Sequence, residues 1–210
     1  MRILLDNEPC PLTADNLGEV LHAANDIAQG QGRLVVEVLV DGIALSDTQL
    51  LEEERLQASA TEIHLRTCTA MDILCETFQN ASMAVLESEQ VQEQAAKLIQ
   101  AGNHLEGMKT LSMALATWIE VHDAVVKGLT LAGEDPETLQ INEIRFSDAS
   151  TGLQQQLTQL REGITNSDAS MICDSLLYEF PAICTDWAGL LQGLSERYDS
   201  TDVNDSEKEA

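Results

Sequence analysis

The pattern of hydrophobic and polar positions changes once along the chain, near Thr69. Before Thr69, apolar residues occur in short, partly alternating runs at 2–5, 34–40 and 62–65, and Asp41-Gly42 after the second run is a strong hairpin signal. After Thr69, apolar residues recur every three or four positions, which is the period of an amphipathic helix. The pattern therefore predicts a small sheet-containing domain over residues 1–69, followed by helices.

An amphipathic helix is expected between the strand-like runs. Thr13 is the predicted N-cap and Gly30 the predicted stop. The apolar positions at helical spacing between them are Leu17, Val20, Leu21, Ala24 and Ile27. The expected order is two short strands, a helix, a hairpin and a last strand, which builds a sheet of four or five strands with one helix laid across it.

This first third of the chain resembles the small β-grasp, ubiquitin-like sulfur carriers. The resemblance is carried by MRILLDNEPCPL, the amphipathic helix, LVVEVLVDG and the closing EIHLRT, and it implies a β-grasp fold. Those carriers end in a free Gly-Gly tail that is activated. Here the last strand runs on through Thr67-Cys68-Thr69, and the chain contains no Gly-Gly. We therefore reject sulfur carriage and conjugation and expect a binding module.

The remainder of the chain predicts four amphipathic helices, over about 70–101, 104–132, 148–165 and 169–198. Each has one apolar face that it cannot bury alone, so an up-and-down four-helix bundle follows. Pro181 should kink the last helix, because it lacks the backbone N–H that bonds to Leu177 O. The stretch 137–146 fits a short helical turn or a linker equally well.

The predicted fold class is therefore α+β, with a β-grasp-like domain at 1–69, an all-α bundle at 70–198 and a disordered acidic tail at 199–210. The bundle resembles small, uncharacterised helical bacterial proteins whose arrangement is similar to flagellin-type export chaperones. LIQAGNHLEGMKTLSMALATWIEVHDAV and DSLLYEFPAICTDW carry this resemblance. It implies an acidic, cytosolic helical bundle.

The net charge and the cysteines limit which ligands and which cellular compartment are expected. With 11 Lys+Arg against 36 Asp+Glu, the net charge is −25, which disfavours nucleic acids and anionic membranes. No run of about 18 apolar residues exists to span a bilayer, and the first residues do not form a signal peptide. The five cysteines form no C-x-x-C pair and are best read as reduced thiols in the cytoplasm. The acidic excess serves either solubility, including adaptation to salt, or a basic partner.

Candidate chemistry is sparse, and we expect no catalytic residue, metal or cofactor. His122 lies on the apolar face of the second long helix, and Glu179 lies at the edge of the apolar face of the last one. If these helices are neighbours, His122 and Glu179 form one buried, charge-assisted pair. Such a pair is more often a device for structural specificity than a catalyst.

We therefore expect a non-catalytic, cytoplasmic adaptor that binds another protein, either by strand addition at a sheet edge or by a helix in a groove of the bundle. Adaptable methionines for such a groove are Met71, Met83, Met108, Met113 and Met171. The alternatives are an export chaperone, a self-associating homodimer and, from another class, a small-molecule enzyme with its site at the domain seam.

Overall fold

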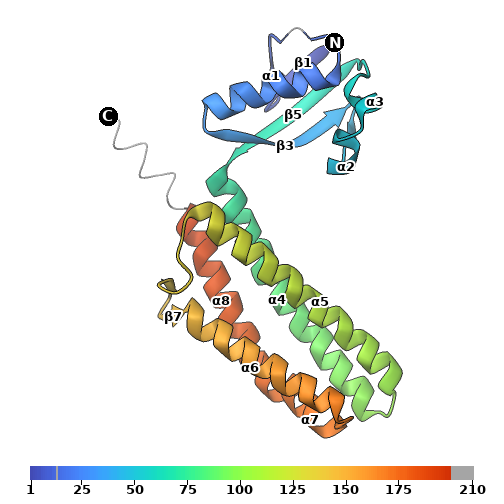
Figure 1. Ribbon diagram of the computed structural model, residues 1–210, viewed down its shortest axis with the longest axis vertical. Helices are drawn as coiled ribbons and strands as arrows, with labels where there is room; N and C mark the ends of the chain where they lie inside the picture. The colour runs from blue at the N-terminus through green and yellow to red at the C-terminus, as the bar shows by residue number, and fades with distance from the viewer. Residues whose placement is uncertain (13, 200–210) are drawn as a thin grey trace. The chain divides into compact units, whose positions relative to one another are not determined.

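The computed structural model describes residues 1–12 and 14–199 and has a mixed α+β fold, which confirms the predicted class (Figure 1). The chain divides into two units, at residues 1–73 and from Leu74 onward. We call them the N-terminal unit and the helical unit. Apart from Asp199, which ends the last helix, the predicted tail 199–210 lies outside the described residues.

The N-terminal unit contains a five-stranded sheet in the order β2-β1-β5-β3-β4. Only β1 and β5 are parallel, and the other neighbours are antiparallel. Asp6-Asn7 and Asp41-Gly42 make the tight turns of the two hairpins with positive φ throughout, as two-residue hairpin loops require. The strands are β1 (Arg2–Leu5), β2 (Glu8–Pro9), β3 (Arg33–Val40), β4 (Ile43–Ala44) and β5 (Glu62–Thr69).

Helix α1 (Leu17–Gly30) lies across this sheet, as the sequence predicts. It begins later than expected, because Asn16 is its N-cap and accepts a hydrogen bond from Glu19 N at 3.0 Å; the predicted cap, Thr13, lies outside the described residues. The buried core between helix and sheet consists of Ile3, Leu17, Val20, Ala24, Val38, Ile63 and Leu65. Two short helices precede β5: α2 (Asp47–Leu50) and α3 (Glu53–Leu56).

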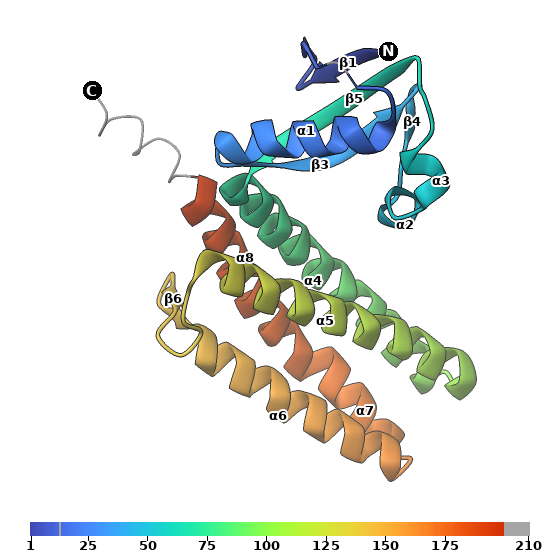
Figure 2. The same cartoon turned by 45° about the horizontal axis from the view of Figure 1, so that its top comes forward.

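The helical unit is built from long helical segments that run alongside one another (Figures 1 and 2). They are α4 (Ala70–Gln100), which starts in the N-terminal unit, α5 (His104–Ala132), α6 (Phe146–Thr165), and the continuous run α7 (Ala169–Asp174), η1 (Ser175–Glu179) and α8 (Phe180–Asp199). The buried ring of Trp187 makes edge-to-face contacts with Trp118 and Phe146, which joins α5, α6 and α8. No described helix combines the length and apolarity needed to cross a membrane.

The connection between α5 and α6 is neither a helical turn nor a plain linker, the two interpretations that the sequence left open. It contains a small hairpin, β6 (Gln140–Ile141) and β7 (Ile144–Arg145). Asn142 and Glu143 turn it with φ of 48° and 69°. The hairpin packs on α8 at Gly193, where any Cβ would collide with Ile141.

The last helix is interrupted one turn before Pro181. Residues 175–179 form a π-helical turn, and Phe180 N–H donates to Ser175 O, five residues back. Pro181 has no N–H to continue the ordinary pattern, and a wide turn is one way in which a helix absorbs that loss. The perturbation predicted at Pro181 therefore lies in the preceding turn.

Candidate functional site

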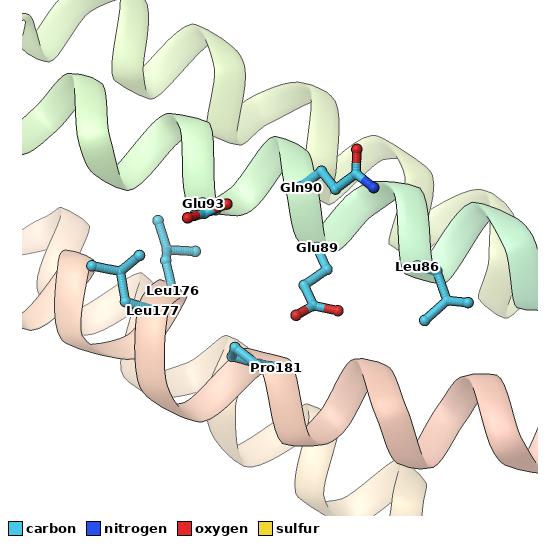
Figure 3. Close-up of a pocket in the computed structure, with 7 residues that line it drawn as sticks. All are labelled: Leu86, Glu89, Gln90, Glu93, Leu176, Leu177 and Pro181. Carbon is cyan, nitrogen blue, oxygen red and sulfur yellow. The ribbon is translucent and has the colours of Figure 1, made fainter.

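An open groove lies between α4 and the π-helical turn and has a volume of about 510 Å³ (Figure 3). We call it the α4–η1 groove. The residues that line it are Leu86, Glu89, Gln90 and Glu93 from α4, and Leu176, Leu177 and Pro181 from η1 and α8. Figure 3 shows Glu89 directed from α4 toward Pro181, whereas Gln90 points away from it. The groove therefore has apolar walls with carboxylates along one side.

Helical spacing places the α4 residues together. Leu86, Glu89, Gln90 and Glu93 are separated by three, one and three positions, so they share one face of the helix. Leu86 remains 46% exposed, although it is a large aliphatic residue. Glu93 Oε1 lies 2.6 Å from Lys97 Nζ, one turn further along. This face is thus partly apolar and partly acidic.

The opposite wall comes from the π-helical turn itself. Leu176 is buried, whereas Leu177 and Pro181 are half-buried and line the groove. A π-helical turn widens the helix by one residue, and such turns occur often at functional sites. Here the wide turn and the proline ring place apolar surface opposite the carboxylates of α4.

A buried polar ladder lies on the inner side of α4. Gln92 Nε2 donates to Ser88 Oγ at 3.1 Å, and Ser88 Oγ donates to Ala114 O on α5. The Cys184 thiol on α8 donates to Gln92 Oε1 at 3.9 Å. Burial, reinforced by the charge of Glu89, raises the pKa of Cys184 to about 12. Cys184 is therefore an unreactive, protonated thiol that joins helices.

The groove is suited to binding. Its lining offers two carboxylates, one amide and aliphatic surface, but no hydroxyl, thiol, imidazole or amine. Among the residues that the structure describes, no group of His, Cys, Asp and Glu side chains is arranged to hold a metal ion. Carboxylates beside apolar walls complement a ligand that carries both cationic and apolar groups.

The predicted pair of His122 and Glu179 is not buried. His122 lies on α5 and Glu179 ends η1, and both are exposed. The expectation of burial was wrong for His122 because the buried face of α5 runs through Trp118, Val121 and Val125, so that His122 lies one position outside it. Glu179 is the last residue of the π-helical turn and is exposed.

The α4 side of the groove was not predicted from the sequence. The alternation of Leu86 with Glu89 and Glu93 at helical spacing was the available signal. None of the five methionines named for an adaptable groove lines this one. Met83 is nearest in register, one turn before Leu86 on the same face, and is 50% exposed.

The other predicted binding surface, a sheet edge, is formed by the two-residue outer strands β2 and β4 and, among the described residues, by a longer stretch of β3. Its neighbour β4 pairs with Leu39 and Val40 alone, so the outer edge at 33–37 has no described strand beside it. A β-bulge lies between Val35 and Glu37 on this strand. Bulges and charged residues are typical protections of an edge against further pairing. The α4–η1 groove is therefore the stronger candidate.

Comparisons of the chain with protein-family models, with curated proteins and with solved structures give no match.

Proposed function

We propose that this protein is a non-catalytic, cytoplasmic adaptor that binds a basic, amphipathic segment of another protein in the α4–η1 groove. The proposal rests on one observation: Glu89 and Glu93 line the same groove as the apolar residues Leu176, Leu177 and Pro181. An amphipathic helix with apolar residues on one face and Lys or Arg at its border matches both features.

The charge of the whole chain supports the same partner. A net charge of −25 repels anionic ligands and attracts basic segments over several ångströms, which speeds their encounter. The two groove carboxylates then add local complementarity. A basic partner is thereby favoured over the alternative that the acidic excess serves solubility alone.

We include in this proposal that the N-terminal unit is a β-grasp-like domain and acts as a second binding module. Its support is the strand order, with β1 parallel to β5 between two hairpins and one helix across the sheet. Export chaperoning is a special case in which the bound segment belongs to a secreted protein. Enzymatic action at the groove is not proposed, because its lining carries no hydroxyl, thiol, imidazole or amine beside the carboxylates.

A defined peptide tests the groove. The probe is a fluorescently labelled helix of about five turns with Leu on one face and Lys at its border, and the matched control peptide carries Glu in place of Lys. Anisotropy should show binding of the Lys peptide only, and added salt should weaken it. The double variant Glu89→Gln, Glu93→Gln should lower the affinity about three- to ten-fold.

Glu87→Gln is the matched protein control, because Glu87 is exposed on α4 and lies outside the groove lining. Leu86→Ala tests the apolar contribution separately. If Glu87→Gln weakened binding as much as the groove variants, the peptide would be bound by general surface charge. In that case the proposed site would be wrong.

A further inference from the structure

Helix α5 exposes large apolar side chains on the face that points away from the bundle core. Leu105 is 81% exposed, Ile119 70% and Val126 44%. Successive turns bury the opposite face through Leu111, Trp118 and other residues. A helix that is apolar on a second face carries surface for a partner beyond its own bundle.

Three of the exposed apolar residues of α5, Leu105, Ile119 and Val126, fit a seven-residue repeat, whereas Met113 and Leu131 lie beside it. Starting at Leu105, steps of alternately four and three residues trace one continuous line on the exposed face. This line, which we call the α5 seam, consists of Leu105, Lys109, Ser112, Ala116, Ile119, Asp123 and Val126, all of them exposed. Alternating steps of three and four are the spacing with which one helix packs along another in a coiled coil. The seam extends about 32 Å at 1.5 Å per residue.

Two charged residues interrupt the seam, and they are opposite in sign. Lys109 lies seven residues before Ala116, and Asp123 lies seven residues after it. Within the described part of the chain, Lys109 forms no ion pair, and Asp123 meets only Lys127 of the same helix, at 2.7 Å between Nζ and Oδ2. The charges are therefore arranged symmetrically about the middle of the seam.

We propose that the α5 seam binds the α5 seam of a second copy of this chain, with the two helices antiparallel and crossing near Ala116. In this arrangement each Lys109 lies within one turn of the partner chain's Asp123, so both charges are paired. A parallel arrangement would instead place each Lys109 against the partner's Lys109 and each Asp123 against the partner's Asp123. Like charges facing one another across a helix pair are destabilising, so the sequence selects the antiparallel pairing.

The distribution of charge along the chain favours α5 as the contact between two copies. Two chains of −25 repel each other, and the repulsion is smallest where the local charge is lowest. Within α5, two Lys nearly balance three acidic residues, for a sum of −1. Helix α4 has five acidic residues and one Lys, for a sum of −4. The small Ala116 at the centre permits close approach of the helices.

Solution mass across a concentration series tests the proposal, with the full chain in physiological salt. The wild type should approach twice the 22.9 kDa of one chain. Ile119→Glu should weaken association at least ten-fold, and circular dichroism should show unchanged helix content, because Ile119 is exposed. Leu51→Glu is the matched control, since Leu51 is 82% exposed on the N-terminal unit, and it should associate like the wild type.

Charge reversal tests the antiparallel orientation. Lys109→Asp and Asp123→Lys should each weaken self-association, and the double variant should restore it. An equimolar mixture of the two single variants should form mixed dimers, because each then supplies the charges that the other lacks. A wild type that stays monomeric, an Ile119→Glu variant that still associates, or a double variant that is no better than the singles would each overturn the proposal. If the wild type is monomeric, the remaining candidate to bind the seam is a helix of another protein.

Discussion

The two units of the molecule differ in how they expose apolar side chains. In the N-terminal unit, large exposed apolar residues form no long line: Leu34 and Val36 lie on β3, Ile43 lies on β4 and Leu51 follows α2. In the helical unit they gather along α4 and α5, where they occur at helical spacing. Scattered apolar residues are normal on protein surfaces, whereas aligned ones indicate a partner. The longest aligned apolar surfaces are therefore on the helical unit, and the main binding surfaces are expected there.

The units also use glycine differently. Gly32 and Gly42 of the N-terminal unit have positive φ and lie in turns, and a Cβ added at either position would have no neighbouring atom within 4 Å. In the helical unit, Gly107 and Gly128 on α5 face α4 so closely that a Cβ would lie within 2.7 Å of a side-chain atom. Glycine thus shapes turns of the sheet, whereas in the bundle it permits the close approach of the consecutive helices α4 and α5.

The largest predicted effect is a loss of stability that is confined to the helical unit. Trp187→Ala removes a fully buried ring, its contacts with Trp118 and Phe146, and the hydrogen bond from Nε1 to Ala149 O. We expect the helical unit to lose about 3–5 kcal/mol of unfolding free energy. Trp118 remains in the helical unit as a fluorescence reporter for urea unfolding, and amide signals report on the N-terminal unit.

Trp187→Phe is the matched control, because it keeps a ring in place and loses mainly the hydrogen bond. It should cost about 1–2 kcal/mol. The sheet signals should not shift in either variant. If the sheet unfolded together with the bundle in Trp187→Ala, the division into two units would not hold energetically.

A smaller effect is expected where α5 approaches α4. Gly128→Ala places a methyl group 2.7 Å from Cζ of Phe78, whose ring is fully buried and stacks on Tyr198 at 5.7 Å between centroids. The buried ring must shift to admit the methyl group, so we expect a loss of about 1–3 kcal/mol in unfolding free energy. Urea unfolding followed by tryptophan fluorescence measures it.

Gly152→Ala is the control for the intrinsic effect of replacing a helical glycine. Gly152 lies in α6, and no atom of a neighbouring element lies within 4 Å of the position that an alanine methyl group would take. Alanine should stabilise the helix there by about 0.5–1 kcal/mol. Stabilisation by Gly128→Ala as well would mean that Phe78 yields easily, and that α4 and α5 are not held at this distance by the glycine.

The parts of the fold that were predicted from the sequence are those with a signal in neighbouring residues. Alternation in β3 and β5, the Asp41-Gly42 turn and the apolar face of α1 are short-range signals, and the sheet with one helix follows from them. The hairpin at 140–145 escaped prediction because its strands have two residues each, too few to show alternation. Its turn residues, Asn142 and Glu143, include no glycine, although both have positive φ.

The groove was less predictable, because it depends on relations between distant segments. The apolar character of Leu176 and Leu177 was evident in the sequence, but the π-helical turn that places them opposite Glu89 was not. Pro181 marked the place of the perturbation, but the sequence did not show that it takes the form of a π-helical turn. Burial of His122 was mispredicted because a helix face is set by all of its neighbours, and a shift of one position moves a residue about 100° around the axis.

The smallest predicted effect lies in the N-terminal unit, at a polar cluster that ties the first hairpin to β5. Asp6 accepts hydrogen bonds from Thr67 N at 2.7 Å and from Thr67 Oγ1 at 2.6 Å. Arg33 donates to Thr67 Oγ1 and Thr67 O, and its Nη2 lies 3.7 Å from Asp6 Oδ2. Partial burial raises the pKa of Asp6, but the Thr67 hydrogen bonds and the nearby arginines outweigh it, so the pKa is lowered.

Lowering of this pKa on folding makes the stability of the sheet depend on pH. The carboxylate stabilises the folded state fully above the unfolded-state pKa, near 3.8, and the stabilisation is lost as the pH falls through the lower folded-state value. Asp6→Asn keeps the turn, since Asn tolerates φ of 52°. The variant should be less stable than the wild type at pH 7, by less than about 1 kcal/mol because the side chain is 40% exposed.

This difference between Asp6→Asn and the wild type should shrink as the pH falls below about 3.8 and Asp6 itself becomes neutral. Amide signals of β1 and β5 during urea unfolding at several pH values measure it. Glu8→Gln removes one negative charge from the same hairpin and reports the general effect of net charge. A difference that stayed constant with pH would show that the Asp6–Thr67 hydrogen bonds act through geometry alone, without a contribution from the ionised carboxylate.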